Sequence, residues 1–430
     1  MDVYLTTLGC RTNEAELESW THGFRVAGHR IVSTPTEAQI IVVNTCAVTN
    51  EAVRKSRKLM RRLWRENPEA HFVLTGCYVE LEPTEVKNIL DLEKLFLVAN
   101  RDKDRLVNLA DEAWNLSGID SNSAVLSKGS RTRAFVKVQD GCRNKCAFCV
   151  VSVARGSERS RAIHTVVDDV NELCNAGYKE VVLCGVHLGG YGNDLGTDLF
   201  ALVAEIIKKT KIPRIRLSSL EPWDLPLEFW ELWQDKRLCP HLHLPLQSGC
   251  DAVLQRMFRR CTTKQYEDIV TEARSAIEGL TITTDIIVGF PGETDDEWNA
   301  TLDFVRKIGF SHIHCFVFSA RKEATAFGFG LRIPDGVKKE RSQQLHDIAN
   351  QMKEEQLRAW IGRERPVLWE GRPKRCSNTS RSVVRWRGLT DNYLRTETFV
   401  STNSELENRI QLVHLVSVEN GILRAELPNN

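Results

Sequence analysis

Three of the thirteen cysteines in this 430-residue chain, Cys142, Cys146 and Cys149, are spaced C-x3-C-x2-C in one short stretch. Such a loop can bring three thiolates to one metal centre, and an all-sulfur ligand set is typical of iron-sulfur clusters or zinc. Zinc needs a fourth ligand, and the nearest downstream candidates, His164 and Cys174, lie outside the usual spacing. The triplet therefore favours a 4Fe-4S cluster with one iron left open for a further ligand.

A second set of three cysteines follows predicted strands in the first hundred residues. Short apolar runs at residues 3–8, 40–44 and 71–75 predict these strands, and a cysteine lies just past the end of each. The three are Cys10, Cys46 and Cys77. Because open α/β sheets hold their ligands at the carboxyl edge of the strands, we expect the three cysteine loops to converge.

The segments between these strands carry helical patterns, at residues 14–27 and 51–66. Strands alternating with helices are typical of a parallel sheet, so we predict an N-terminal parallel α/β domain over residues 1–115. A stretch rich in Ser, Gly and Asn, residues 116–133, predicts the boundary that follows it.

The central part of the chain repeats this alternation on a larger scale. Its predicted strands are residues 134–139, 180–184, 214–218, 241–244, 282–288 and 312–318, with helical segments such as 166–176 and 295–307 between them. Six β/α units predict a partial (β/α)6 TIM-like barrel, whose site would lie at the C-terminal face. Together with the polar helical segment 337–360, these units make up a predicted domain over residues 130–360.

The last segment, residues 361–428, has alternating β-like runs and predicts a small β module. Residues 361–395 hold nine Lys/Arg and three acidic residues, a local charge of +6, although the whole chain has a formal net charge of only +1. Trp369, Trp386 and Tyr393 are interleaved with these charges. Basic and aromatic side chains together suit RNA backbones and stacked bases, so we predict an RNA contact that includes Arg385, Arg387 and Tyr393.

The predicted helix after Cys46 is strongly basic. Arg54, Lys58 and Arg61 recur at intervals of three and four, as does Arg65, so they share one helical face. A solvated surface helix would show the same pattern. Its position beside the second cysteine set favours contact with RNA phosphates.

The composition and the first residues of the chain exclude several classes of protein. The hydrophobic share of 42% excludes wholesale disorder. No apolar run approaches the roughly 18 residues of a membrane helix, and the first residues do not have the pattern of a signal peptide. An odd number of cysteines without such a signal argues against a disulfide framework. We therefore expect a cytoplasmic protein with no membrane partner, whose thiols are available for metal.

The motifs also resemble a known family. A CxxxCxxC loop after the first strand of a partial barrel resembles the radical S-adenosylmethionine superfamily. The segments LGCRTNEAE, NTCAVTNEA, HLPLQSGCDAVLQRMFRRCT and TTDIIVGFPGET are similar to those of methylthiotransferases, and GLTDNYLRTE resembles the RNA-binding TRAM module that ends them. VKVQDGCRNKCAFC, GVHLGGYG and RLSSLEP are most similar to the subgroup that modifies threonylcarbamoyladenosine in tRNA.

The resemblance implies a transferase of sulfur-containing groups that uses two 4Fe-4S clusters and S-adenosylmethionine. The Cys142, Cys146 and Cys149 cluster would bind S-adenosylmethionine and generate a 5'-deoxyadenosyl radical. A second cluster on the Cys10, Cys46 and Cys77 set would supply sulfur, and a second S-adenosylmethionine the methyl group. The product would be a methylthio group at C2 of N6-threonylcarbamoyladenosine at position 37, in the anticodon loop of tRNA. A flavodoxin or ferredoxin would donate the electron, and DNA would have no part.

Several residues near the predicted barrel mouth are expected to surround S-adenosylmethionine. They are Phe148, Gly185, Gly189, Ser218, Glu221, Gln247, Gly289 and Ser319. Arg155 is expected to pair with the cofactor carboxylate. Tight turns at the glycines and a helix cap at Ser218 are the structural alternatives.

Other functions stay open at this point. The same radical chemistry serves enzymes that act on isopentenyladenosine in tRNA or on a ribosomal-protein aspartate. A different class altogether is a zinc-stabilised RNA-binding protein without catalysis. Iron and acid-labile sulfide in the purified protein would exclude the zinc protein.

Overall fold

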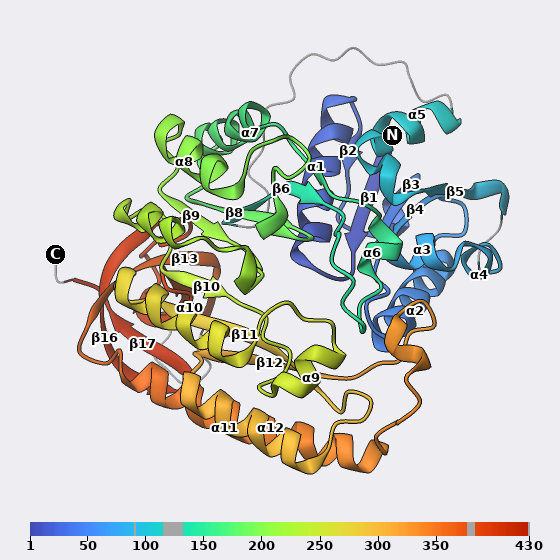
Figure 1. Cartoon of the computed structure of the whole chain (residues 1–430). Coiled ribbons are helices and arrows are strands. Elements are labelled where there is room, and N and C mark those ends of the chain that lie inside the picture. Colours follow the sequence, from blue (N-terminus) through green and yellow to red (C-terminus); the bar gives the residue numbers. More distant parts are fainter. Residues whose placement is uncertain (90–91, 115–131, 376–382, 429–430) are drawn as a thin grey trace.

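The computed structural model describes residues 1–89, 92–114, 132–375 and 383–428, and Figure 1 shows three units in chain order. Most of the predicted boundary at residues 116–133 lies outside the described residues. No helix in the described ranges is long and apolar enough to cross a membrane.

The first unit is a five-stranded parallel sheet of order β2-β1-β3-β4-β5. The strands are β1 (Asp2–Thr7), β2 (Arg30–Ile31), β3 (Ile40–Thr45), β4 (His71–Gly76) and β5 (Leu95–Val98). The helices are α1 (Arg11–Val26), α2 (Asn50–Glu66), α3 (Cys77–Leu81), α4 (Pro83–Lys87) and α5 (Leu106–Trp114). Side chains alternate along β3, so Ile40 packs with α1 and α5 while Ile41 packs with α2. Helices therefore cover both faces of the sheet, and the unit is the predicted parallel α/β fold.

The second unit is an open barrel of six parallel strands. They are β6 (Arg133–Asp140), β8 (Glu180–Gly185), β9 (Arg214–Leu217), β10 (His241–His243), β11 (Thr281–Val288) and β12 (His312–Val317). Only isolated bridges join β9 to β10, among them Ser219 with His243. The two-residue β7 (Arg159–Ser160) pairs antiparallel with β6. The structure confirms the predicted partial barrel.

Helices cover the outside of this barrel (Figure 1). They are α7 (Ile163–Asn175), α8 (Leu199–Lys209), α9 (Asp251–Arg256), α10 (Thr263–Ala276), α11 (Asp295–Ile308) and α12 (Asp335–Arg358), whereas the short α6 (Val151–Arg155) packs against α3 of the first unit. Capping boxes begin two of them: Thr262 with Gln265 at α10, and Thr294 with Glu297 at α11. The T-x-x-Q/E pattern satisfies the first free N–H groups and so sets where each helix starts.

The third unit is a closed barrel of order β13-β14-β15-β17-β16. Its strands are β13 (Glu364–Arg375), β14 (Val383–Thr390), β15 (Arg395–Ser401), β16 (Ile410–Glu419) and β17 (Ile422–Glu426). Trp369 and Trp386 are buried in its core. Although they are interleaved with the basic residues in the sequence, these two tryptophans are not available to stack on RNA, because inward positions of a small barrel must be filled by large side chains.

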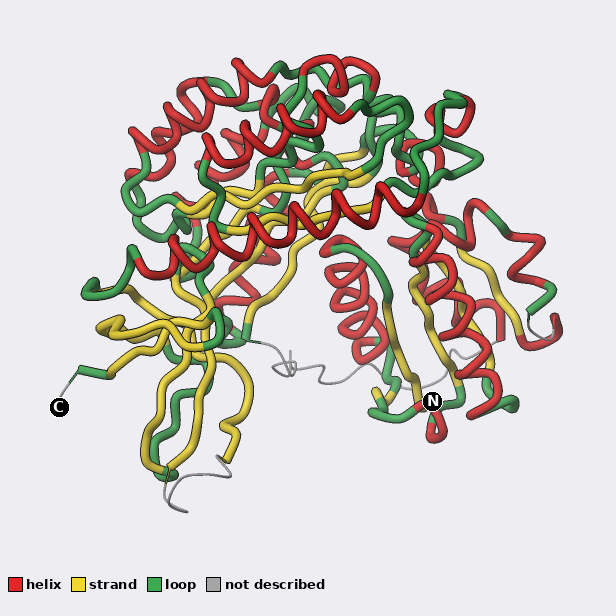
Figure 2. Tube along the Cα trace, turned by 90° about the horizontal axis from the view of Figure 1, so that it is seen from below, coloured by secondary structure: helices red, strands yellow, loops and turns green. Residues whose placement is uncertain are grey.

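Figure 2 shows the N-terminal sheet and the C-terminal barrel on the same side of the central unit. The turn after β14 docks onto the central barrel: Asn392 Nδ2 donates to Gly279 O at 3.2 Å, and the ring of Tyr393 stacks on His241 with centroids 4.4 Å apart. Arg214 Nη2 donates to Pro366 O at 2.6 Å. The three units thus meet around one shared region.

Candidate active site

Both predicted cysteine sets open into one cavity of about 1190 Å³. All six predicted ligands line it, namely Cys10, Cys46, Cys77, Cys142, Cys146 and Cys149. Residues of all three structural units contribute to its wall. Convergence of loops from distant parts of the chain is what the strand-end positions of the cysteines predicted.

The N-terminal cysteines are held by tight backbone turns. Cys10 precedes α1, Cys46 follows β3, and Cys77 opens α3 directly after β4. The N–H of Cys46 donates to Ser56 Oγ at 3.2 Å. Gly76 has φ +103°, and a Cβ there would lie 2.2 Å from Thr45 O. Only glycine fits this position, because both the dihedral and the contact exclude a side chain.

Alanine at position 76 should therefore damage the structure. We expect Gly76→Ala to lose at least about 1 to 3 kcal/mol of unfolding free energy from backbone strain, with the contact to Thr45 O adding to it. Urea denaturation measures the loss. Gly336→Ala is the control, because a Cβ there meets nothing within 4 Å in helix α12 and should be neutral or stabilising. Equal stability of Gly76→Ala and the wild type would contradict this account of the turn.

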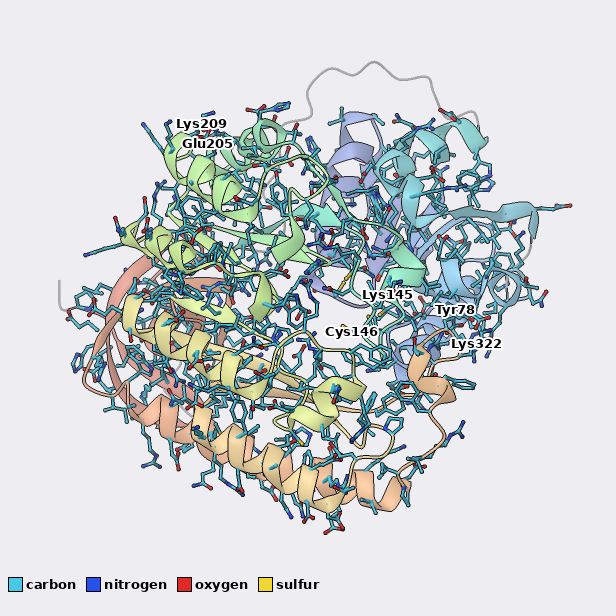
Figure 3. All side chains as sticks on the ribbon, viewed as in Figure 1. Tyr78, Lys145, Cys146, Glu205, Lys209 and Lys322 are labelled. Atoms are coloured by element: carbon cyan, nitrogen blue, oxygen red, sulfur yellow. The ribbon has the colours of Figure 1, made fainter. Side chains whose placement is uncertain are left out.

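The second cysteine loop folds back on itself at the barrel mouth, where Figure 3 labels Cys146. The N–H of Cys142 donates to Gly156 O at 3.1 Å, and the N–H of Cys149 donates to Cys146 O at 3.0 Å. His164 and Cys174, the fourth ligands that a zinc site would need, lie on α7 and do not line the cavity. The loop therefore presents three thiols and no fourth ligand from α7.

The thiols are suited to a highly charged metal centre. Burial raises the pKa of Cys46 and of Cys142 to about 11, and the pKa of Cys149 to about 12. Buried thiols of this kind stay protonated at neutral pH unless a metal supplies positive charge, and the thiolate is the form that binds metal. Two sets of three soft sulfur ligands fit two iron-sulfur clusters.

Five of the eight predicted cofactor residues line the cavity: Phe148, Gly185, Ser218, Glu221 and Gln247. The other three do not. A Cβ on Gly189 would lie 2.7 Å from Asp224 Cβ, and one on Gly289 would lie 2.5 Å from Lys338 Cγ, so both glycines permit close packing. Ser319 Oγ accepts a hydrogen bond from the N–H of Asn50 at 3.0 Å and thereby joins the barrel to α2.

Arg259 is a site residue that sequence reasoning missed. Its Nη1 lies 3.8 Å from Cys146 Sγ, and its Nη2 donates to Glu221 Oε2 at 2.7 Å. The guanidinium also covers the ring of Trp223 at 4.3 Å. Although burial lowers the pKa of Arg259, Glu221 and Cys146 raise it above its ordinary value. The permanent positive charge of Arg259 favours the thiolate form of Cys146. No local spacing in the sequence indicates that Arg259 belongs to the site.

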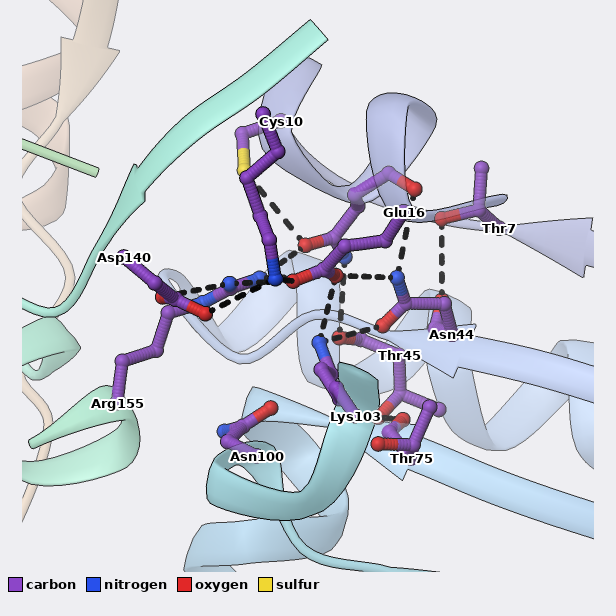
Figure 4. Close-up of polar contacts among 12 residues, drawn as sticks. Thr7, Cys10, Glu16, Asn44, Thr45, Thr75, Asn100, Lys103, Asp140 and Arg155 are labelled. Carbon is purple, nitrogen blue, oxygen red and sulfur yellow. Dashed lines mark hydrogen bonds and ion pairs between the residues drawn. The ribbon is translucent and has the colours of Figure 1, made fainter. Parts of the chain in front are cut away.

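Arg155 lies in a buried charged network beside Cys10 of the N-terminal cysteine set (Figure 4). Its Nη1 donates to Glu16 Oε1 at 2.7 Å and to Asp140 Oδ1 at 2.9 Å, and its Nη2 donates to Asn13 Oδ1 at 2.6 Å. Lys103 Nζ donates to Glu16 Oε2 at 2.7 Å. The structure corrects the expected role of Arg155: its partners are carboxylates of the protein itself, and it joins α1 to the barrel.

Known proteins carry the same combination of regions. The radical SAM superfamily matches residues 136–305, and the uncharacterized protein family UPF0004 matches residues 2–97. The threonylcarbamoyladenosine tRNA methylthiotransferase MtaB of Thermotoga maritima is 37% identical over 86% of each chain. MtaB of Bacillus subtilis is 35% identical over 90% of this chain and 88% of its own. The chain belongs to the methylthiotransferase family of radical SAM enzymes.

More distant similarities fit this family. The tRNA-2-methylthio-N(6)-dimethylallyladenosine synthase of Acetivibrio thermocellus is 30% identical over 98% of this chain and 90% of its own. A solved structure of the radical S-adenosylmethionine methyltransferase TsrM from Kitasatospora setae matches with a TM-score of 0.56 and 16% identity over 74% of each chain. That likeness shows a shared fold only. As a radical SAM methylthiotransferase, the protein uses S-adenosylmethionine and carries two 4Fe-4S clusters.

The glycine-rich loop of this methylthiotransferase is organised by a buried histidine. His187 Nδ1 lies 2.6 Å from Glu158 Oε1, and its Nε2 lies 2.6 Å from Asp224 Oδ2. Although burial lowers the pKa of His187, the two carboxylates raise it above its ordinary value. The histidine therefore fixes the loop that starts at Gly185 and is not a metal ligand.

The predicted RNA-contacting residues of the methylthiotransferase fall into two groups. Arg54, Lys58 and Arg61 are exposed on α2, as predicted, and Arg385 and Arg387 flank Glu397 on the C-terminal barrel at 3.8 and 3.5 Å. Tyr393 differs. Its ring stacks on His241, lies under the guanidinium of Arg216 at 4.9 Å, and accepts a hydrogen bond from Arg11. The structure thus places Tyr393 in the contact between units, where it also lines the cavity, and its contact with RNA stays a prediction.

Proposed function

We propose that this enzyme adds a methylthio group to C2 of N6-threonylcarbamoyladenosine at position 37 of tRNA. The observation that carries the proposal is the single cavity into which both cysteine sets open. A substrate atom in that cavity is within reach of both sets, which is what sulfur insertion at an unactivated carbon requires. The threonylcarbamoyl specificity is supported by the MtaB relatives, at 33–37% identity.

The protein contributes positioning and a closed environment to this chemistry. When bound, the clusters and S-adenosylmethionine supply the one-electron chemistry, the sulfur atom and the methyl group. Gln247 and Glu221 line the mouth of the barrel, where they would orient the cofactor. Arg259 keeps a positive charge beside Cys146. The C-terminal barrel closes the other end of the cavity with Tyr393.

Nucleoside mass spectrometry of tRNA from cells with and without this protein tests the proposal. Loss of the methylthio mark from threonylcarbamoyladenosine alone would support it. Loss of the mark from isopentenyladenosine would instead identify the substrate named for the dimethylallyladenosine synthases. No change in any tRNA nucleoside would contradict a tRNA substrate and leave the ribosomal-protein aspartate or a non-catalytic role.

We also propose that the exposed face of α2 holds tRNA phosphates. Lys58 and Arg61 make no ion pair within the described part of the chain, whereas Arg54 pairs with Glu51 at 2.8 Å. The N–H of Asn50, the first residue of α2, donates to Ser319 Oγ just after β12. The helix therefore begins beside the barrel edge, and the unpaired cations further along its exposed face can displace phosphate counterions on binding.

Replacing both cations tests this surface. We expect Lys58→Gln/Arg61→Gln to weaken tRNA binding. The slope of log K against log salt concentration should become shallower by roughly 1 to 2, because each lost phosphate contact reduces the slope by about one. Fluorescence anisotropy at several salt concentrations measures the slope. Lys208→Gln/Lys209→Gln is the control, on α8 at the opposite side of the molecule (Figure 1, Figure 3). Equal slopes for the α2 variant and the control would argue against this surface.

The remaining parts of the proposal concern partners and place of action. We infer that a flavodoxin or ferredoxin donates the electron, because the radical SAM chemistry starts with a one-electron reduction. We infer a cytoplasmic site of action, because tRNA is the substrate. The C-terminal barrel would anchor the tRNA through Arg385 and Arg387, and its resemblance to the TRAM module supports that role. DNA has no part in this scheme.

A further inference from the structure

The cavity has an excess of positive charge at its far end, away from the cysteines. Eight cations line it, and six have a carboxylate partner within 4.0 Å. The six are Arg11, Arg133, Arg155, Arg216, Arg259 and Arg387. The other two, Lys353 of α12 and Arg395 of β15, have no carboxylate partner in the described ranges. With the nearby His312 of β12 they form what we call the cationic corner.

The members of the cationic corner destabilise one another's charges. The pKa of Lys353 is lowered, chiefly by burial and then by Arg395. The pKa of His312 falls to about 4, through burial and the charges of His314, Lys353 and Arg395. Repulsion of this kind costs free energy in the empty site, and an anion between the cations removes it. The other six cations that line the cavity each have a carboxylate partner. The cationic corner is therefore where an anion would bind most favourably.

Strand register sets the depth of the cationic corner. Gln247, which is predicted to contact the cofactor, pairs across the strands with Ile286, and Ile286 pairs with Cys315 of β12. These three residues therefore lie at the same level of the barrel. His312 lies three residues earlier on the same strand, about 10 Å deeper at the rise of a β-strand. Asp285 and His314 lie between the two levels, and His243 is level with His312 through Thr283. The ligand-type atoms of His243, Asp285 and His314 are within 4.8 Å of one another. A polar wall therefore leads from the barrel mouth down to the corner.

We propose that the cationic corner binds the carboxylate of the threonylcarbamoyl substituent, with His243, Asp285 and His314 along its carbamoyl and hydroxyl groups. The inference rests on the proposed function. C2–H and the exocyclic N6 flank N1 of adenine and point in different directions from the ring, so a base whose C2 faces the cysteines directs its N6 substituent to another part of the cavity. The isopentenyl group is apolar and uncharged, and would leave Lys353 and Arg395 without a partner. The corner would thus select the substrate.

Binding of anticodon stem-loop RNAs to the cluster-loaded, full-length protein tests the inference. The RNAs carry threonylcarbamoyladenosine, its methyl ester or plain adenosine at position 37. We expect Lys353→Gln and Arg395→Gln each to weaken binding of the acid roughly tenfold or more, the worth of a charge-assisted hydrogen bond. Binding of the ester and of plain adenosine should change by less than about twofold, because neither presents the anion.

Lys339→Gln on α12 and Arg409→Gln on the C-terminal barrel are matched controls, since both are exposed and neither lines the cavity. Equal losses on all three RNAs would overturn the inference and show contact with a backbone phosphate instead. Unchanged binding of the acid by both variants would overturn it as well. A wild-type protein that binds acid, ester and plain adenosine equally would also overturn the inference before any variant is made, whereas the proposed substrate itself stands or falls with the nucleoside mass spectrometry.

Discussion

Cys142→Ala should reduce S-adenosylmethionine cleavage to background, whereas Cys46→Ala should retain measurable cleavage but form no methylthio product. Cys142 belongs to the loop at the barrel mouth and lines the same cavity as the predicted cofactor residues Glu221 and Gln247. Cys46 belongs to the N-terminal set, whose predicted role is sulfur supply. Loss of one thiolate ligand from a set of three removes the metal site it serves.

Two measurements separate these effects. Chromatography of 5'-deoxyadenosine reports cleavage, and iron with acid-labile sulfide reports cluster loading. Each variant should lose about half of the iron, while Cys174→Ala, on α7 and away from the cavity, should keep all of it. Total loss of cleavage in a folded Cys46→Ala protein that still holds its barrel cluster would contradict the division of labour between the two sets.

The cysteine sets and the general fold were predictable from sequence because their signals are local. Cys142, Cys146 and Cys149 lie within eight residues, and Cys10, Cys46 and Cys77 each follow an apolar run that any parallel sheet would place at its edge. The short strand β5 was not predicted, although LFLV is apolar, because it follows no helix of ordinary length.

Sequence reasoning missed the contacts whose two partners lie far apart along the chain. Arg155 bonds Glu16 across 139 positions, and Tyr393 bonds Arg11 across 382. Trp386 is of a residue type that often stacks on RNA bases. Here it faces the core of a barrel that closes through strand pairs far apart in the sequence. Spacing rules carry no information about such contacts. Arg259 was missed for the same reason.

Arg155→Met should be strongly destabilising. The side chains of Arg155, Glu16 and Lys103 are each about 1% exposed, so removal of the arginine leaves the Glu16 and Asp140 carboxylates buried without their main partner. Breaking a buried ion pair from one side costs about 3 to 5 kcal/mol. Urea denaturation measures the loss, and adding Glu16→Gln to the variant should recover part of it.

The pH dependence of stability distinguishes this network from simple packing. Although burial raises the pKa of Glu16 and of Asp140, their cationic neighbours, Arg155 first, lower both below their ordinary values of about 4. A carboxyl whose pKa is lower in the folded state stabilises the protein above its unfolded pKa, and this stabilisation is lost as the pH falls through the folded pKa. The wild type should therefore lose stability steeply below about pH 4. In Arg155→Met this loss of stability in acid should be smaller, because the lowering of both pKa values depends on the missing guanidinium. Parallel profiles of stability against pH for the two proteins would refute an electrostatic role for Arg155.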